Sequence, residues 1–133
     1  MSEEKNYGWC LDFIIKDKVN ILCEIGSRDG LDSIYLAETL ETKANYLFEP
    51  DPDLGIEIKE NIKNTEASEK FNFMNIALGE ESKKETFKAV DTDKYNNKGV
   101  GSFFDINFDN REKNDSDYKR ESIQKEIEVE IKR

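Results

Sequence analysis

A short apolar run that ends in a glycine-bracketed turn constrains the fold of this chain more than any other stretch. The run covers residues 21–25, Gly26 and Gly30 follow it, and a helix-like pattern begins at Leu31. Apart from Glu24, which a simple core strand would not carry, a run of this kind is typical of a strand buried on both faces of a parallel sheet. The stretch therefore predicts a strand, a tight turn and a helix N-terminus that exposes backbone N–H groups at the carboxyl edge of the sheet. The same pattern also occurs in ordinary strand-to-helix turns, so a purely structural role stays open.

A second apolar run, residues 45–48, ends in Glu49. A βαβ unit with an acid about 20 positions beyond the glycines has the geometry that hydrogen-bonds a ribose diol. The pair of features therefore predicts a ligand of the nucleoside type. Asp51 precedes Pro52 and is interpreted mainly as a helix cap, since a capping acid followed by proline starts many helices.

The remaining patterns predict one α/β domain over residues 1–133. A strand is expected within residues 70–78, a shorter one at 85–90, and a half-buried closing strand at 127–131, which together make a hairpin-like C-terminal portion. Residues 99–104 are expected to form a flexible turn with two exposed aromatic side chains. Residues 107–125 are charged and nearly free of apolar side chains, which predicts a mobile loop.

Composition excludes several classes of function. The chain has 20 basic and 30 acidic residues and a formal charge of −10, which argues against nucleic acid as a partner. No apolar stretch approaches the ~20 residues needed to cross a bilayer, and the N-terminus is not a signal peptide, so a cytoplasmic protein without membrane contact is expected. Cys10 and Cys23 are expected to be buried free thiols. The absence of histidine removes the commonest general base and metal ligand, and no metal site is expected.

Three segments in this order resemble FkbM-type methyltransferases that depend on S-adenosylmethionine. They are residues 24–30, 48–52 and 75–79. The resemblance implies a Rossmann-like class I methyltransferase fold, S-adenosylmethionine as the cofactor, and a hydroxyl of a sugar, glycan or small metabolite as the methyl acceptor. It assigns no catalytic residue. The cofactor-binding residues that it implies are Glu24, Gly26, Ser27, Arg28, Gly30, Glu49, Asn75 and Ala77.

Within this set, the resemblance implies a different part of the cofactor for each segment. Residues 26–30 are expected against the methionine part, and Glu49 on the ribose hydroxyls. Asn75 and Ala77 are expected along the adenine. Glu24 stands where many members of the family carry aspartate.

FkbM-like domains continue beyond the closing strand into further parallel strands, including an acidic segment near the transferred methyl group. This chain stops at Arg133, so the resemblance implies a truncated fold. A natural fragment, a split enzyme completed by a partner, an artificially shortened chain and a degenerate relative all stay open. The exposed sheet edge invites a partner chain or a homo-oligomer.

Two other functions compete with methyl transfer. One is a non-catalytic fragment that binds S-adenosylmethionine or a partner protein. The other is a dinucleotide-dependent oxidoreductase. The oxidoreductase is disfavoured because Arg28 stands between the glycines, where a Gly-x-Gly-x-x-Gly turn carries another glycine.

Overall fold

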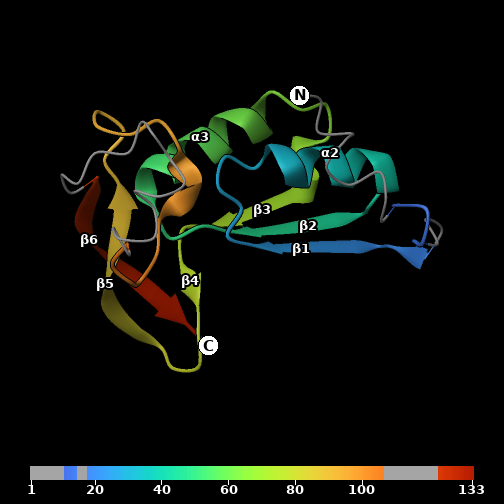
Figure 1. Ribbon diagram of the computed structural model, residues 1–133. Helices are drawn as coiled ribbons and strands as arrows, with labels where there is room; N and C mark the ends of the chain where they lie inside the picture. The colour runs from blue at the N-terminus through green and yellow to red at the C-terminus, as the bar shows by residue number, and fades with distance from the viewer. Residues whose placement is uncertain (1–10, 15–17, 107–122) are drawn as a thin grey trace.

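Two small sheets and two α-helices make up the computed structural model, which describes residues 11–14, 18–106 and 123–133 (Figure 1). The first sheet is parallel, in the order β1–β2–β3. Its strands and the helices between them are β1 (Ile21–Ile25), α2 (Leu31–Leu40), β2 (Ala44–Phe48), α3 (Pro52–Lys63) and β3 (Phe71–Met74), with a short 3₁₀ turn η2 (Ser68–Lys70) before β3. The predicted α/β class and the alternation of strands and helices are confirmed.

The helix starts follow from local sequence. Asp51 caps α3, because its carboxylate accepts a hydrogen bond from the backbone N–H of Asp53 at 2.9 Å, and Pro52 occupies the first helical position. The predicted cap is therefore confirmed. The N-cap of α2 is Gly30, which has a left-handed backbone with φ of 77°. Neither helix in these described ranges is long and apolar enough to cross a membrane.

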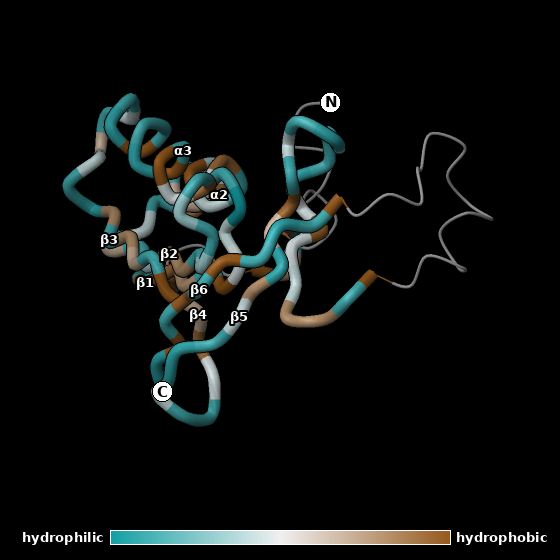
Figure 2. Tube along the Cα trace, turned by 90° about the vertical axis from the view of Figure 1, so that its left-hand side faces the viewer, coloured by the Kyte–Doolittle hydropathy of each residue, from teal (hydrophilic) through white to brown (hydrophobic). Residues whose placement is uncertain are grey.

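Both helices cover the same face of the first sheet (Figures 1 and 2). Leu47 on the central strand and Ile58 on α3 are fully buried between these layers. The other face of β1 is open, with Ile21 63% and Ile25 66% exposed, and Cys23 exposed between them. The prediction that this strand is buried on both faces is therefore wrong, and so is the predicted burial of the Cys23 thiol. Cys10 lies outside the described residues.

The second sheet has the order β4–β6–β5 and lies beyond the carboxyl ends of β1–β3 (Figure 1). It contains β4 (Ala77–Leu78), β5 (Lys83–Val90) and β6 (Gln124–Lys132). β5 and β6 are antiparallel, which is the hairpin-like arrangement predicted, and β4 pairs with β6 in parallel. The strand predicted within residues 70–78 is divided between the two sheets.

The core of the second sheet consists of Phe87, Ala89 and Val129. Phe103 packs edge-on against Phe87 with ring centroids 5.1 Å apart, whereas Phe104 is 78% exposed. Of the two aromatic side chains predicted to be exposed, only Phe104 is exposed, and the prediction is wrong for Phe103. Most of the predicted mobile loop, residues 107–122, lies outside the described residues. Its last residues, 123–125, are ordered instead, because Ile123 is buried and β6 begins directly after it.

Candidate functional site

The turn between β1 and α2, residues 26–30, is fastened to the end of β2 by backbone hydrogen bonds. The N–H groups of Gly26 and Ser27 both donate to the carbonyl of Phe48, at 2.8 and 3.0 Å, and the N–H of Arg28 donates to the Glu49 carboxylate at 3.0 Å. The expectation that backbone N–H groups are exposed here is therefore wrong at these three positions. Their bonds instead hold the turn at the carboxyl edge of the sheet, beside the acid.

The two glycines of the turn have different surroundings. Gly26 has φ of 80°, and a Cβ built on it meets nothing within 4 Å. Gly30 has φ of 77°, and its Cβ would lie 3.3 Å from the Leu47 side chain and 3.4 Å from that of Ile58. Both positions favour glycine because of their left-handed backbone. Space for a ligand exists only above Gly26, whereas Gly30 lets the turn pack on the core.

Glu49 is the central side chain of the site. It is only 6% exposed, and each carboxylate oxygen accepts one backbone hydrogen bond at 3.0 Å, Oε2 from Arg28 and Oε1 from Asp51. Burial raises the pKa of the Glu49 carboxyl, against the lowering effect of these two hydrogen bonds. An ionised carboxylate can accept about four hydrogen bonds, so about two acceptor positions remain for a ligand.

Glu24 lies in β1, directly before the turn, and is also held by its neighbours. Its carboxylate accepts a hydrogen bond from the Ser33 hydroxyl at the start of α2, and its carbonyl accepts one from the Ser27 hydroxyl at 3.1 Å. Burial is the main cause that raises the pKa of the Glu24 carboxyl. Its negative charge also raises the pKa of Glu49. The charges of Glu24 and Glu49 therefore influence each other. The observed hydrogen bonds of Glu24, however, stabilise the turn and the start of α2.

Asn75 and Ala77, which were expected along the adenine, are separated by the structure. The amide of Asn75 donates to the carbonyls of Glu49 and Pro50, at 2.7 and 3.2 Å, and so holds the loop that carries the acid. Ala77 is buried in β4 and pairs with Ile131 in the second sheet. Asn75 therefore lies at the site, whereas the observed contacts of Ala77 belong to the second sheet.

A cavity of about 200 Å³ adjoins the Glu49 carboxylate. Sites for drug-sized ligands typically measure about 300–1,000 Å³, so this cavity has room for only part of such a ligand. The residues that line it are Gly26, Arg28, Glu49, Pro50, Asp51, Leu54, Phe87, Lys98, Gly99 and Gly101. The turn, the loop after β2 and the segment after β5 therefore meet at one place.

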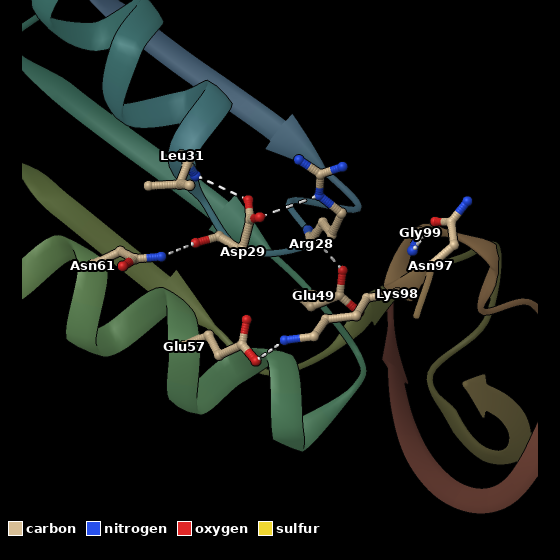
Figure 3. A network of polar contacts seen from close by, with 9 residues as sticks. All are labelled: Arg28, Asp29, Leu31, Glu49, Glu57, Asn61, Asn97, Lys98 and Gly99. Carbon is tan, nitrogen blue, oxygen red and sulfur yellow. Dashed lines mark hydrogen bonds and ion pairs between the residues drawn. The ribbon is translucent and has the colours of Figure 1, made fainter. Parts of the chain in front are cut away.

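The segment after β5 is the part of the site that the sequence did not reveal. It includes the short 3₁₀ turn η3 (Lys98–Val100), and Lys98 extends across the site to pair with Glu57 on α3 (Figure 3). For residues 99–104 the sequence predicts only a flexible turn. The repeated glycines of this stretch are a sequence signal for close approach of the backbone to another segment. A Cβ built on Gly99 would lie 3.7 Å from the Arg28 side chain, so the two segments are close.

The arrangement suits a ligand that offers hydroxyl donors to a buried carboxylate. Over the described residues, no cluster of His, Cys, Asp and Glu side chains is grouped so as to hold a metal ion. No protein-family model, no curated protein and no solved structure matches this chain.

Proposed function

We propose that this chain is an S-adenosylmethionine-dependent methyltransferase of the FkbM type, with a Rossmann-like class I fold. The observation that carries the proposal is the buried carboxylate of Glu49, at the carboxyl end of β2 and in contact with the glycine turn. In open α/β sheets, ligands bind in the crevice outside the carboxyl ends of the strands. An acid placed there, one βα unit after a glycine turn, has the geometry that holds two ribose hydroxyls.

The residues fit the ribose of such a cofactor. The Glu49 oxygens are fixed by Arg28 and Asp51 and still have free acceptor positions toward the cavity. The space above Gly26 admits a group that a side chain there would exclude. The turn N–H groups of Gly26 and Ser27 are occupied by Phe48, which leaves them unable to cradle a pyrophosphate. This pattern favours a nucleoside over a dinucleotide.

When bound, S-adenosylmethionine supplies a methyl group on a sulfonium centre, and the chain has to hold that group in line with an acceptor oxygen. Orientation of this kind provides much of the rate of such reactions. A hydroxyl of a sugar or small metabolite is the proposed acceptor, and the charge of −10 argues against a nucleic acid. A carboxylate, lysine or tyrosine has to accept the hydroxyl proton, because the sequence contains no histidine.

A second candidate is a non-catalytic module of the same fold that binds the cofactor or a partner protein. The observation in its favour is the open face of β1, where Ile21, Cys23 and Ile25 are exposed. Parallel sheets are usually covered on both faces, so another polypeptide can complete this one. Under this alternative the site still binds the cofactor, but no methyl group is transferred.

Calorimetric titration with S-adenosylmethionine, S-adenosylhomocysteine and NAD in parallel tests the proposal. We expect binding of the two S-adenosyl compounds and none of NAD in the Glu49 cavity, because Glu49 offers a diol acceptor and the bonded N–H groups of the glycine turn cannot hold a pyrophosphate. Equal binding of all three ligands, or binding of NAD alone, would refute the assignment. A methyl-transfer assay with labelled cofactor and a panel of sugars and hydroxylated metabolites then separates the enzyme from the non-catalytic module.

A further inference from the structure

A second, larger hollow adjoins the cavity at Glu49. It measures about 700 Å³ and is formed between the glycine turn and the segment after β5. We call it the basic bowl. Its lining residues are Arg28, Asp29, Lys94, Tyr95, Asn96, Asn97, Lys98 and Gly99. The basic bowl and the Glu49 cavity adjoin, because Arg28, Lys98 and Gly99 line both.

The charge of the basic bowl is opposite to that of the chain. Arg28, Lys94 and Lys98 line it, and Asp29 is the only acid among its lining residues. The whole chain, by contrast, has 30 acidic and 20 basic residues. The acids that pair with the two lysines, Asp91 and Glu57, are not among the lining residues. Each cation is ion-paired, but cations outnumber acids three to one among the lining residues, which favours an anionic ligand in an otherwise acidic protein.

The existing ion pairs do not prevent these cations from binding a ligand. The Arg28 guanidinium lies 3.4 Å from Asp29, and Lys94 lies 3.4 Å from Asp91. The third cation, Lys98, pairs with Glu57 on α3. The side chains of Arg28, Lys94 and Lys98 are 48%, 54% and 37% exposed, and exposed pairs of this kind are worth only about 0–1 kcal/mol. A phosphate or carboxylate can therefore replace the weak partners, and arginine binds both groups in a bidentate manner.

The neutral groups of the basic bowl suit hydroxyls. Asn96 and Asn97 are exposed and carry amides, which both donate and accept hydrogen bonds, and Tyr95 adds an aromatic ring. The Asn97 side chain is oriented by accepting a hydrogen bond from the Gly99 N–H at 3.0 Å, as Figure 3 shows. Amides and a ring beside three cations match a polyhydroxylated molecule that carries one oxyanion.

We propose that the basic bowl binds a small hydroxylated molecule through an oxyanion, either a phosphate or a carboxylate, on Arg28, Lys94 and Lys98. The basic bowl adjoins the Glu49 cavity, so the bound molecule would be the methyl acceptor, and this identification rests on the proposed function. Binding of the anion itself does not depend on the proposed function. The substrate class is thus an acidic or phosphorylated sugar or a similar polyol, rather than a neutral one.

Titration with glucose 6-phosphate, glucuronate and glucose tests the inference and distinguishes the two anions. We expect binding of one or both anionic sugars and about tenfold or more weaker binding of glucose, because a charge-assisted hydrogen bond is worth at least a factor of ten. Lys94→Gln should weaken the anionic sugar about tenfold, and Lys98→Gln should do so as well. The matched control is Lys83→Gln, which removes an exposed, ion-paired lysine from β5.

Titration of the same variants with S-adenosylhomocysteine separates this inference from the proposed function. Lys94 lines only the basic bowl, so Lys94→Gln should leave the affinity for S-adenosylhomocysteine unchanged. The inference would be overturned if glucose bound as tightly as glucose 6-phosphate or if none of the three sugars bound. It would also be overturned if Lys94→Gln and Lys83→Gln weakened the affinity for the anionic sugar equally. Anion binding without any S-adenosylhomocysteine binding would support the basic bowl and refute the methyltransferase assignment.

Discussion

Replacement of Glu49 by glutamine tests the role of the buried acid with almost no change in shape. Glutamine keeps one acceptor oxygen but places an NH₂ group opposite one of the two backbone N–H donors, those of Arg28 and Asp51, at 3.0 Å. One charge-assisted hydrogen bond is lost, which costs about 1.5–3 kcal/mol of folding free energy. Part of this cost is offset, because a carboxylate whose pKa is raised by burial is removed. We expect a net loss below about 3 kcal/mol and a folded variant.

The effect on ligand binding should be larger and more specific. A ribose diol donates to both oxygens of the carboxylate, and the amide of Glu49→Gln can accept only one of these hydrogen bonds. Loss of the other, at about 1.5–3 kcal/mol, weakens S-adenosylhomocysteine about 10- to 150-fold. The control variant is Glu60→Gln, which makes the same chemical change at an exposed position of α3. Its affinity should equal that of the unmodified chain.

Calorimetric titration gives the affinities, and urea denaturation monitored by circular dichroism shows whether each variant is folded. The reasoning is refuted if folded Glu49→Gln binds S-adenosylhomocysteine as tightly as the unmodified chain. That result would mean that Glu49 only ties the glycine turn to the start of α3.

Three further substitutions or conditions address the fold around the site. Asp51→Ala should lower the free energy of unfolding by about 0.5–2 kcal/mol, because α3 loses its N-cap, and an unchanged urea midpoint would contradict this. Gly30→Ala should destabilise the chain more than Gly26→Ala, because both glycines have left-handed backbones but only a Cβ at Gly30 meets core side chains. A lower thermal midpoint for Gly26→Ala than for Gly30→Ala would be inconsistent with this packing. Burial raises the pKa of Glu24 and Glu49, so the folded chain binds more protons than the unfolded chain above the ordinary value of 4.5. Their contribution to the free energy of unfolding is therefore greatest below that value and is lost as pH rises through the raised pKa values. Urea denaturation between about pH 5 and pH 7.5 measures this dependence. If the free energy of unfolding changes with pH as steeply in the Glu24→Gln/Glu49→Gln double variant as in the unmodified chain, the linkage is disproved.

The features predicted correctly from the sequence depend on neighbours close along the chain. The apolar run of residues 21–25, the helical period from Leu31 to Leu40 and the proline after Asp51 each determine a local conformation. The position of Glu49 beside the glycine turn was also predictable, because parallel βαβ units bring successive carboxyl strand ends to one edge.

The features that were wrong or missed depend on contacts between distant segments. An apolar run does not reveal whether a second layer covers its outer face, and at β1 the described chain supplies helices on one face only. Ala77 appeared to continue the third strand, but pairing with Ile131 places it in another sheet. The approach of Lys98 to Glu57 joins segments 41 residues apart, and no short-range pattern predicts such a contact.

The most direct test of the proposed cofactor site is the response of individual backbone amides to S-adenosylhomocysteine in a nitrogen-15 labelled sample. We expect the largest chemical-shift changes at Gly26, Arg28 and Asp51, because these amides border the Glu49 cavity or donate to its carboxylate. The amides of β5 at residues 83–86 should not change, since none of these residues lines that cavity. Saturable changes confined to the three site amides would support a nucleoside site at the turn. Changes absent from them at a saturating ligand concentration would contradict it.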